Sequence, residues 1–344
     1  MKGPAIGIDM GTRNVRAVCI QDGSVKAIST REREDGQDMS ALLTTLREDA
    51  EVFLKKFVSS CVVALPVQAS SAQREEVSKA ANASGFEETR ILPGPVMAAL
   101  SSGRRGRLLV FDFGASATLS VVDCEGGRAG TVLESAEEPG SLEFDPILAA
   151  WLRERLLLPQ MKEGDPRWRT LLREAEKVKI ALSDCAAFLW TPPAELRALP
   201  ELTVEREDLE RLIRFPIRRL IHTARRLWKC YAPERLLLVG GASRTPLLQN
   251  ILRQEMERPE LLTLGAENAV ARGAALCAAE ERGENAERRL QELKRSLSDI
   301  ELLLTREQQN RLKLLFSRFG EDFSQPRMQE LAEDLARDLK RAVA

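Results

Sequence analysis

The sequence predicts a two-lobed α/β protein that carries an α-helical C-terminal extension. A block of strand, hairpin, helix, strand and helix occurs twice along the 344 residues. Each block opens with a buried strand that ends in Asp-x-Gly, at Asp9 and at Asp112. Alternating strands and helices predict mixed or parallel sheets that are covered on both faces. The last sixty or so residues are charged, helical in period and nearly free of Gly and Pro, which indicates amphipathic helices.

The first lobe is expected over residues 1–104. Asp22-Gly23 is a hairpin dipeptide that joins its second and third strands. Ser70 or Ser71 caps its second helix, and Gly85 ends that helix. The strands are expected at 5–10, 15–21, 24–30, 61–66 and 89–92. The helices are expected at 39–57, 71–84 and 95–102.

The second lobe is expected over residues 105–281, and the helical extension over 282–344. Gly273 lies inside the last helix of this lobe, which predicts close packing against a neighbour. The strands are expected at 107–114, 117–123, 128–134, 235–241 and 261–264. The helices are expected at 144–157, 166–182, 205–230, from Pro246 onward, and at 267–280.

Charge and hydropathy argue against nucleic-acid and membrane partners. The formal net charge is -1, so no global charge draws the chain to either. A run of arginines has helical spacing and no interleaved aromatic residues, which indicates a solvated helix face; it contains Arg218, Arg219, Arg225 and Arg226. No apolar stretch approaches the ~20 residues that span a bilayer, and the N-terminal residues lack the apolar region of a signal peptide. We therefore expect a cytoplasmic protein.

Cysteine and histidine usage gives no sign of a metal or redox site. The six cysteines form no C-x-x-C pair, and most lie inside apolar runs, so we expect buried, reduced thiols. His222 is the only histidine and has no second ligand nearby.

The two Asp-x-Gly segments have the composition of phosphate-binding loops. An Asp at the end of a strand can hold a hydrated Mg²⁺. Gly11 and Gly114 permit tight turns whose backbone N–H groups face a phosphate, and Thr12 adds a hydroxyl donor. One such segment is also typical of an ordinary β-turn. Two copies, each opening a lobe, favour the functional interpretation.

A third segment joins a strand to a helix through Gly240 and Gly241. The two glycines would let a flat ring approach the backbone, and the Arg244 guanidinium could stack on that ring. The alternative is an ordinary junction between a strand and a helix.

In this order, the three segments resemble the phosphate-one, phosphate-two and adenosine motifs of the actin-like ATPases, whose fold is ribonuclease-H-like. The seventy-kilodalton heat-shock (DnaK-type) chaperones are the most similar family, over about residues 4–281. CVVALPVQASSAQREEVSKAANASGFEETRIL (61–92), EAEKVKIALS (174–183) and VGGASRTPLLQNIL (239–252) resemble further family segments. The resemblance implies that ATP or ADP binds between the lobes, and that Lys179 and Ser183 contact adenosine. It also implies that Asp9 and Asp112 serve a degenerate catalytic site and hold Mg²⁺ through water.

The departures from the family pattern argue against efficient hydrolysis. The family's catalytic lysine lies in an insertion that is missing here, and Gly94 stands where the family has a catalytic Glu. By residue counting, Leu119 replaces the second Asp of the phosphate-two motif. Arg13 stands where the family has a small hydroxyl residue; it either supplies a cation near the phosphates or is a surface residue of the hairpin. No strand-rich segment follows, so the family's peptide-clamping β-sandwich is expected to be absent.

These features leave several functions open. The first is a DnaK-type chaperone-like protein that binds an adenine nucleotide, hydrolyses it weakly or not at all, and meets a protein partner or client through a lobe surface or the C-terminal helices. The second is a nucleotide-free pseudo-ATPase scaffold. The third is a slow ATP hydrolase of the actin-like superfamily, and a filament-forming relative stays open as a fourth.

Overall fold

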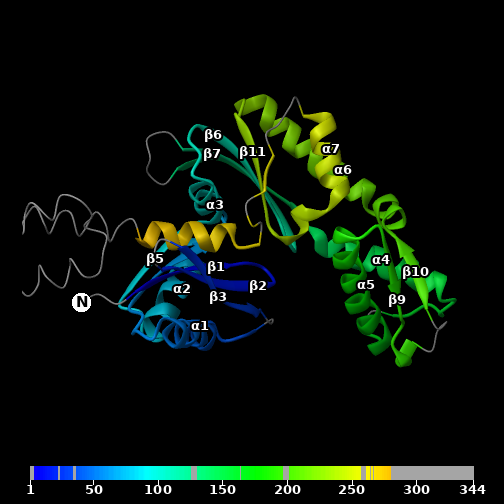
Figure 1. Cartoon of the computed structure of the whole chain (residues 1–344), viewed down its shortest axis with the longest axis horizontal. Helices are drawn as coiled ribbons and strands as arrows, with labels where there is room; N and C mark the ends of the chain where they lie inside the picture. Colours follow the sequence, from blue (N-terminus) through cyan, green and yellow to red (C-terminus); the bar gives the residue numbers. More distant parts are fainter. Residues whose placement is uncertain are drawn as a thin grey trace, which may run out of the picture. The chain divides into compact units, whose positions relative to one another are not determined.

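Two five-stranded mixed sheets form the two lobes of the protein (Figure 1). This computed structural model describes residues 4–21, 24–33, 36–124, 130–162, 164–196, 201–256, 261–263, 265 and 267–279. The predicted extension over 282–344 and the predicted hairpin dipeptide at 22–23 lie outside the described residues. The two-lobed α/β architecture predicted from the sequence is confirmed.

The sheet of the first lobe has an antiparallel meander on one side and two parallel strands on the other. Its strand order is β3 (Ser24–Glu32), β2 (Asn14–Gln21), β1 (Ala5–Met10), β4 (Ser60–Leu65) and β5 (Glu88–Pro93). β1 pairs antiparallel with β2 and parallel with β4, and β5 continues the parallel side. The central strands are buried on both faces, as their continuous apolar runs predict.

Helices α1 (Met39–Leu54) and α2 (Ser71–Ala83) cover one face of this sheet. Leu42, Leu43 and Leu46 of α1 share a buried core with Ile6 and Ile8 of β1. α2 begins with a capping box between Ser70 and Gln73, because each side chain hydrogen-bonds the other residue's backbone N–H. Ser70 is therefore the cap of the two serines considered from the sequence.

The sheet of the second lobe repeats this plan. Its strand order is β12 (Leu261–Thr263), β11 (Arg235–Val239), β6 (Arg107–Phe113), β7 (Ser116–Asp123) and β8 (Thr131–Pro139). β6, β7 and β8 form the antiparallel meander, and β11 and β12 form the parallel side. Phe111 and Phe113 of β6 pack in a core with residues of α4 (Phe144–Arg155), α5 (Pro166–Asp184), α6 (Arg206–Tyr231) and α7 (Pro246–Glu255).

Edge strand β8 continues to Pro139, beyond residue 134 where the sequence predicts its end. Helix α6 supplies hydrogen-bond partners at residue 134 and beyond it. The second half of β8 is rich in glutamate, which reads as a loop. In the structure, Glu134 accepts hydrogen bonds from Arg226 and from the Tyr231 hydroxyl, each at 2.7 Å. Glu138 accepts one from Thr223 at 2.6 Å. Arg226, which belongs to the arginine run of α6, thus pairs with a glutamate in the sheet of the second lobe.

A small antiparallel hairpin was not expected from the sequence. β9 (Ala187–Trp190) and β10 (Leu202–Glu205) pair between α5 and α6. Each is only four residues long, too short for a periodic pattern, and prolines follow β9. Trp190 and Val204 are buried in the core of the second lobe, so tertiary packing stabilises these strands.

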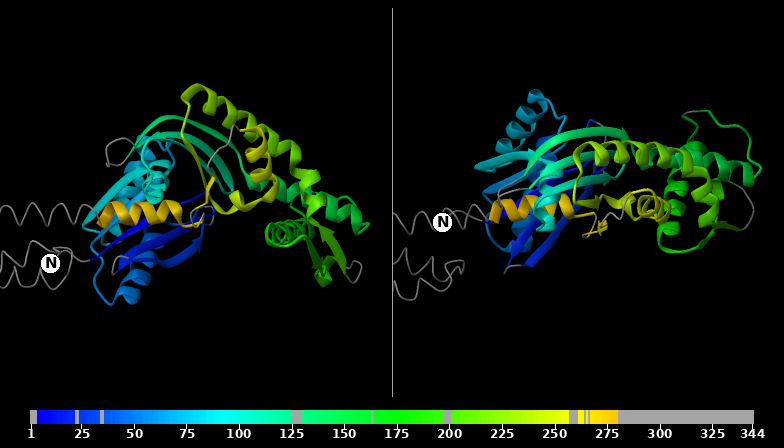
Figure 2. Two further views of the ribbon diagram at one scale, coloured as in Figure 1. Left: turned by 45° about the horizontal axis from the view of Figure 1, so that its top comes forward. Right: turned by 90° about the horizontal axis from the view of Figure 1, so that it is seen from above.

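Each lobe contributes a helix that packs against the other lobe (Figure 2). α3 (Gly94–Ser102) follows β5 of the first lobe and contacts β6, β7, β8 and β11 of the second. Residues 269–279 are helical, follow β12, and pack Ala271 and Ala275 against Val18 of β2. A Cβ at Gly273 would lie 1.7 Å from the Met97 carbonyl oxygen, so these two helices cross in direct backbone contact. The predicted close packing at Gly273 is confirmed.

Within the part of the chain that the structure describes, no helix combines the length and the apolar character needed to cross a membrane.

Candidate functional site

A cavity of about 370 Å³ lies between the two sheets, a size typical of small-molecule sites. Every site residue predicted from the sequence lines it. Its lining includes Asp9, Gly11, Thr12, Arg13, Asp112, Gly114, Lys179, Ser183, Gly240, Gly241 and Arg244. Three segments that are far apart in the sequence therefore meet around one space.

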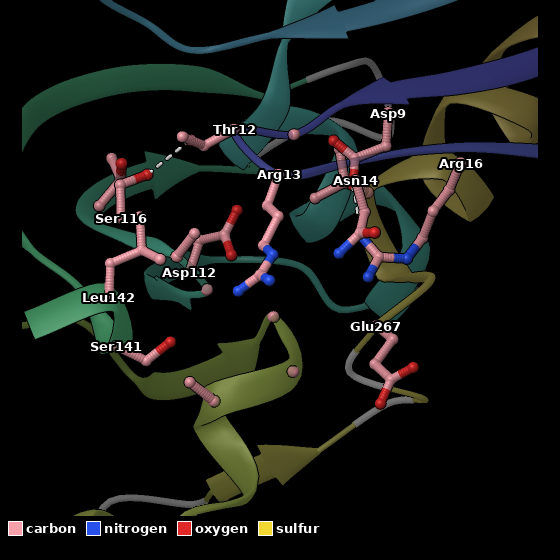
Figure 3. A pocket seen from close by; sticks show the side chains of 18 of the residues that line it. Asp9, Thr12, Arg13, Asn14, Arg16, Asp112, Ser116, Ser141, Leu142 and Glu267 are labelled. Carbon is pink, nitrogen blue, oxygen red and sulfur yellow. Dashed lines mark hydrogen bonds and ion pairs between the residues drawn. The ribbon is translucent and has the colours of Figure 1, made fainter. Parts of the chain in front are cut away.

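The two Asp-x-Gly turns face each other across this cavity. In the first turn, a Cβ at Gly11 would lie 2.5 Å from the Asn14 carbonyl oxygen, so the turn closes too tightly for a side chain. The Thr12 hydroxyl lies 2.9 Å from the Ser116 hydroxyl of the second turn. Figure 3 shows this hydrogen bond bridging the two loops.

Asp9 and Asp112 form a pair of partly buried carboxyl groups. Burial, followed by repulsion from Asp112, raises the pKa of Asp9 to about 7. Burial raises the pKa of Asp112 to about 6. The positive charge of Arg16 opposes both pKa shifts, and its Nη1 lies 3.9 Å from Asp9 Oδ2. The pair is thus short of compensating charge at neutral pH.

These residues do not fit a divalent cation held directly by the protein. Within the described ranges, no group of three or more His, Cys, Asp or Glu side chains could hold a metal ion. Two carboxylates supply few of the oxygen ligands that Mg²⁺ needs, and the guanidinium of Arg16 already lies beside one of them. Water-mediated Mg²⁺ at Asp9 and Asp112 stays a prediction from the family resemblance.

The structure places Leu119, the residue that counting matches to the second Asp of the phosphate-two motif, away from the cavity. Leu119 is fully buried in the core of the second lobe and does not line the cavity. Asp112 pairs with Thr118 in the β6–β7 register, and Thr118 lines the cavity. Asp9 pairs with Arg16, seven residues later, whereas Asp112 pairs with a residue six positions later. The shorter hairpin shifts the cavity-facing position by one residue.

Arg13 is neither a free cation nor a simple surface residue. Its two terminal nitrogens donate hydrogen bonds of 2.5 and 2.6 Å to the two oxygens of Glu176 on α5. This bidentate ion pair joins the first Asp-x-Gly turn to the second lobe. Its Nε also lies 3.4 Å from Glu32 Oε1. In this state the guanidinium of Arg13 is engaged by two carboxylates.

One face of helix α5 forms another wall of the cavity. Glu176, Lys179, Ile180 and Ser183 recur at helical spacing and all line it. Lys179 Nζ lies 2.6 Å from Asp145 Oδ1 and donates to the Ser141 carbonyl oxygen at 3.3 Å. Ile180 is 57 % exposed although it is apolar, so it offers an uncovered hydrocarbon surface to the cavity.

The two glycines of the third segment have different roles. Gly240 has φ +82, and a Cβ there would lie 2.5 Å from the Phe113 carbonyl oxygen, so it fits the backbone against the second phosphate loop. At Gly241 the nearest atom to a Cβ, Glu267 Cγ, is 3.8 Å away, so this residue leaves room in the cavity. Arg244 Nη2 lies 2.5 Å from Asp184 Oδ1, and Nη1 lies 3.7 Å from Glu267 Oε1.

Gly94 also lines the cavity, at the N-terminus of α3. A Cβ there would be in ordinary contact, 3.5 Å from the Leu65 carbonyl oxygen. Close backbone packing therefore does not require a glycine at this position, and no carboxylate extends from it into the cavity.

Sequence reasoning missed several residues of the site. Arg16 could have been found from the hairpin register, because the residue opposite Asp9 shares its environment. Glu176 could have been found from helical spacing, since it lies three residues before Lys179. Glu267 and Asp184 carry no local signal, because only the tertiary fold brings them to Arg244.

Comparison with known proteins places these segments in a family. A family model described as Hsp70 protein matches residues 34–303, which include the second loop and the double-glycine segment. The chain is 28 % identical over 291 residues to Chaperone protein DnaK of Thermosipho melanesiensis, covering 78 % of this chain and 48 % of that protein. It is 30 % identical over 268 residues to Chaperone protein dnaK1 of Synechococcus elongatus, covering 70 % and 41 %.

Chaperone protein HscA homolog of Laribacter hongkongensis is 27 % identical over 268 residues, covering 74 % of this chain and 43 % of that protein. The chain thus spans less than half the length of these curated relatives. Because the family model matches most of the sequence and the family's segments meet around one cavity, the chain belongs to the Hsp70 family.

Proposed function

We propose that this chain is a chaperone-like adenine-nucleotide-binding protein that hydrolyses its nucleotide slowly or not at all. The observation that carries the proposal is the single cavity in which both phosphate loops and the double-glycine segment meet. Its volume suits a molecule of nucleotide size. Membership of the Hsp70 family makes ATP or ADP the expected ligand.

The phosphate chain would lie between the two turns. The Thr12 and Ser116 hydroxyls supply donors on both sides, whereas the Gly114 N–H already donates to the Ser116 carbonyl oxygen at 2.9 Å. The adenosine would lie toward α5 and Gly241. Ile180 there gives apolar surface and Gly241 gives room for a ring, while Ser183 and Arg244 give polar contacts.

We expect weak or absent hydrolysis because carboxylates are missing from two positions at the cavity. Gly94 offers no carboxylate where the family has a catalytic Glu, and Thr118 faces Asp112 where a second carboxylate would be needed. Loss of one positioned catalytic group typically slows a reaction by ~10²–10⁴-fold. Losses within one catalytic unit are not additive, but they leave turnover very slow.

The biological readout in this proposal is contact with a protein partner or client in the cytoplasm. Three apolar side chains that are close in sequence near the end of α1 are exposed, with exposed fractions of 79 % at Val52, 44 % at Phe53 and 56 % at Phe57. We propose that they contribute to the surface that meets the partner, because contiguous exposed apolar patches mark interaction sites. Light scattering of a heat-unfolded client tests this part. We expect wild type to suppress aggregation more than a Val52→Glu, Phe57→Glu variant does, and equal curves would contradict it.

A second candidate, a nucleotide-free scaffold, is favoured by one specific observation. Side chains of the two lobes already bond to each other across the cavity, through Arg13 with Glu176 and through Thr12 with Ser116. Such contacts can hold the lobes together without a ligand. The two candidates differ only in whether nucleotide enters.

Thermal unfolding with ADP or ATP decides between them. Ligand at 100 times Kd stabilises the folded state by ~2.7 kcal/mol, so we expect a clear rise in the Tm of wild type. Gly241→Val should abolish the rise, because the added carbons occupy the open part of the cavity. Gly94→Ala is the matched control, since its methyl group makes only ordinary contacts. No shift in wild type at millimolar nucleotide would leave the scaffold as the function.

A further inference from the structure

The hairpin of the first lobe places a guanidinium beside Asp9 and within electrostatic reach of Asp112, two partly buried carboxylates. Arg16 stands directly opposite Asp9 in the β1–β2 register, and its Nη1 lies 3.9 Å from Asp9 Oδ2. The side chains of Arg16 and Asp9 are only 18 % and 17 % exposed, so solvent screens this pair weakly. Both residues line the cavity, and Figure 3 shows them on one side of it.

The second lobe does not place a cation at the matching position of its hairpin. The residue opposite Asp112 in the β6–β7 register is Thr118, so one guanidinium serves two carboxylates. Arg13 does not add a second, because Glu176 holds it through two hydrogen bonds of 2.5 and 2.6 Å. Among the described residues that line the cavity near the two aspartates, Arg16 is therefore the cation without a hydrogen-bonded carboxylate.

The distance between Arg16 and Asp9 matters for what the guanidinium can do. At 3.9 Å the two groups attract each other, but they do not form a hydrogen bond. A guanidinium has five N–H donors in a planar fork that matches phosphate oxygens. Arg16 can therefore compensate Asp9 and still present donors to a phosphate in the cavity.

A divalent cation would compete with this arrangement. It would have to share the carboxylate of Asp9 with a positive charge that is fixed by the hairpin, and like charges in a buried site repel strongly. The described residues also offer no group of three or more metal-binding side chains.

We propose that Arg16 supplies the positive charge between the phosphate loops that a divalent cation would otherwise supply, so that this chain binds adenine nucleotide independently of Mg²⁺. The proposal rests on the proposed function, because it concerns the nucleotide of that same cavity. It assigns Arg16 as a ligand-binding residue.

Calorimetric titration of the full chain with ADP tests this, in buffer with Mg²⁺ and in buffer with EDTA. We expect the Kd of wild type to change by less than threefold between the two buffers. Arg16→Thr, which copies the second lobe, should weaken ADP binding at least tenfold in EDTA and regain part of that affinity with Mg²⁺. Arg16→Lys keeps the charge and should stay independent of the metal.

The outcomes separate this inference from the function on which it rests. Wild type that binds ADP with Mg²⁺ but loses tenfold or more in EDTA would overturn the role of Arg16 alone. Wild type that binds ADP in neither buffer would overturn nucleotide binding as well. Mg²⁺ without nucleotide gives an independent readout. It should leave the Tm of wild type unchanged and raise that of Arg16→Thr, and a rise in wild type would contradict the proposal.

Circular dichroism and the thermal transition without ligand show whether Arg16→Thr is folded. If that variant does not fold, Arg16→Lys and the wild-type comparison between Mg²⁺ and EDTA still decide, because neither depends on it.

Discussion

The two lobes have one strand plan but differ in the charge that each places at the cavity. In each lobe, an antiparallel meander of three strands lies beside two parallel strands, and a helix follows that packs against the other lobe. The residue opposite the loop aspartate is Arg16 in the first lobe and Thr118 in the second. The shared plan fixes where the two aspartates meet, and a single register position decides whether a cation accompanies them.

The lobes also differ in what joins the third strand to the fourth. Among the described residues, α1 forms this connection in the first lobe, whereas the connection in the second lobe includes α4, α5, β9, β10 and α6. The insertion brings Glu176, Lys179 and Ser183 to the cavity. In the proposed nucleotide complex, the groups that face the phosphates would come from both lobes, while those of α5 that face adenosine would come from the second lobe.

The two lobes meet where α3 crosses the helix at 269–279, and Gly273→Ala is expected to disrupt this packing. The added methyl group would overlap the Met97 backbone, which cannot move without shifting a helix. We expect a loss of free energy of unfolding on the order of 3 kcal/mol. Urea denaturation measures it, with Gly94→Ala as the matched control because that residue has room for a Cβ. Equal stability of the two variants would contradict this packing.

Asp9→Asn removes the carboxylate that faces Arg16 and so tests the charge balance of the first lobe. The folded-state pKa of Asp9, about 7, lies above its ordinary value of 3.8, so the folded state retains a proton that the unfolded state releases. The free energy of unfolding of wild type therefore falls as pH rises from 4 to beyond 7. The free energy of unfolding of the variant should not fall in this way, so at pH 8 the variant should be more stable than wild type by on the order of 1–2 kcal/mol. The expected difference is small because the Asp9 side chain keeps some solvent contact.

Asp49→Asn is a control of opposite sign in the same lobe. Burial acts to raise the pKa of Asp49, but hydrogen bonds from Ser29 and Arg31 outweigh it and lower that pKa. Its contribution is present above the ordinary pKa and is lost as pH falls through the folded-state value. The variant should be less stable than wild type at pH 7, and the difference should shrink in acid. If the free energy of unfolding of wild type and of Asp9→Asn had the same dependence on pH, the raised pKa of Asp9 would be contradicted.

A smaller effect is expected where Arg13 and Glu176 join the lobes. The two side chains are 32 % and 24 % exposed, so water weakens their attraction. A double-mutant cycle with Arg13→Ala and Glu176→Gln should give a coupling free energy of about 1 kcal/mol in urea denaturation. Additive effects would mean that the lobes are not held together at this point.

Much of the fold could be predicted because its signals are local. Buried apolar strands, the Ser70 cap and the glycines each act within a few residues. The convergence of both Asp-x-Gly turns with Gly240 and Gly241 on one cavity was also predicted, because the three segments resemble the nucleotide-binding motifs of the actin-like ATPases. The four-residue strands β9 and β10 could not be predicted, since burial of Trp190 and Val204 stabilises them rather than any periodic pattern.

The charge pairs of the site were harder to predict from the sequence than its position. The Arg13–Glu176 pair joins residues 163 positions apart, and no spacing rule covers such a distance. The difference between Thr118 and Leu119 depends on hairpin length, because a shift of one residue moves a side chain to the other face of the sheet. Sequence reasoning therefore located the site but not its electrostatic balance.

The central claim is that the two loops hold a phosphate chain between the lobes, and a calorimetric titration with ADP and with adenosine tests it most directly. Adenosine can occupy only the part of the cavity near α5 and Gly241, whereas ADP also engages the turns at Gly11 and Gly114. We expect ADP to bind at least tenfold more tightly than adenosine, a difference in binding free energy of about 1.4 kcal/mol. Equal affinities, or no binding of either compound, would contradict it.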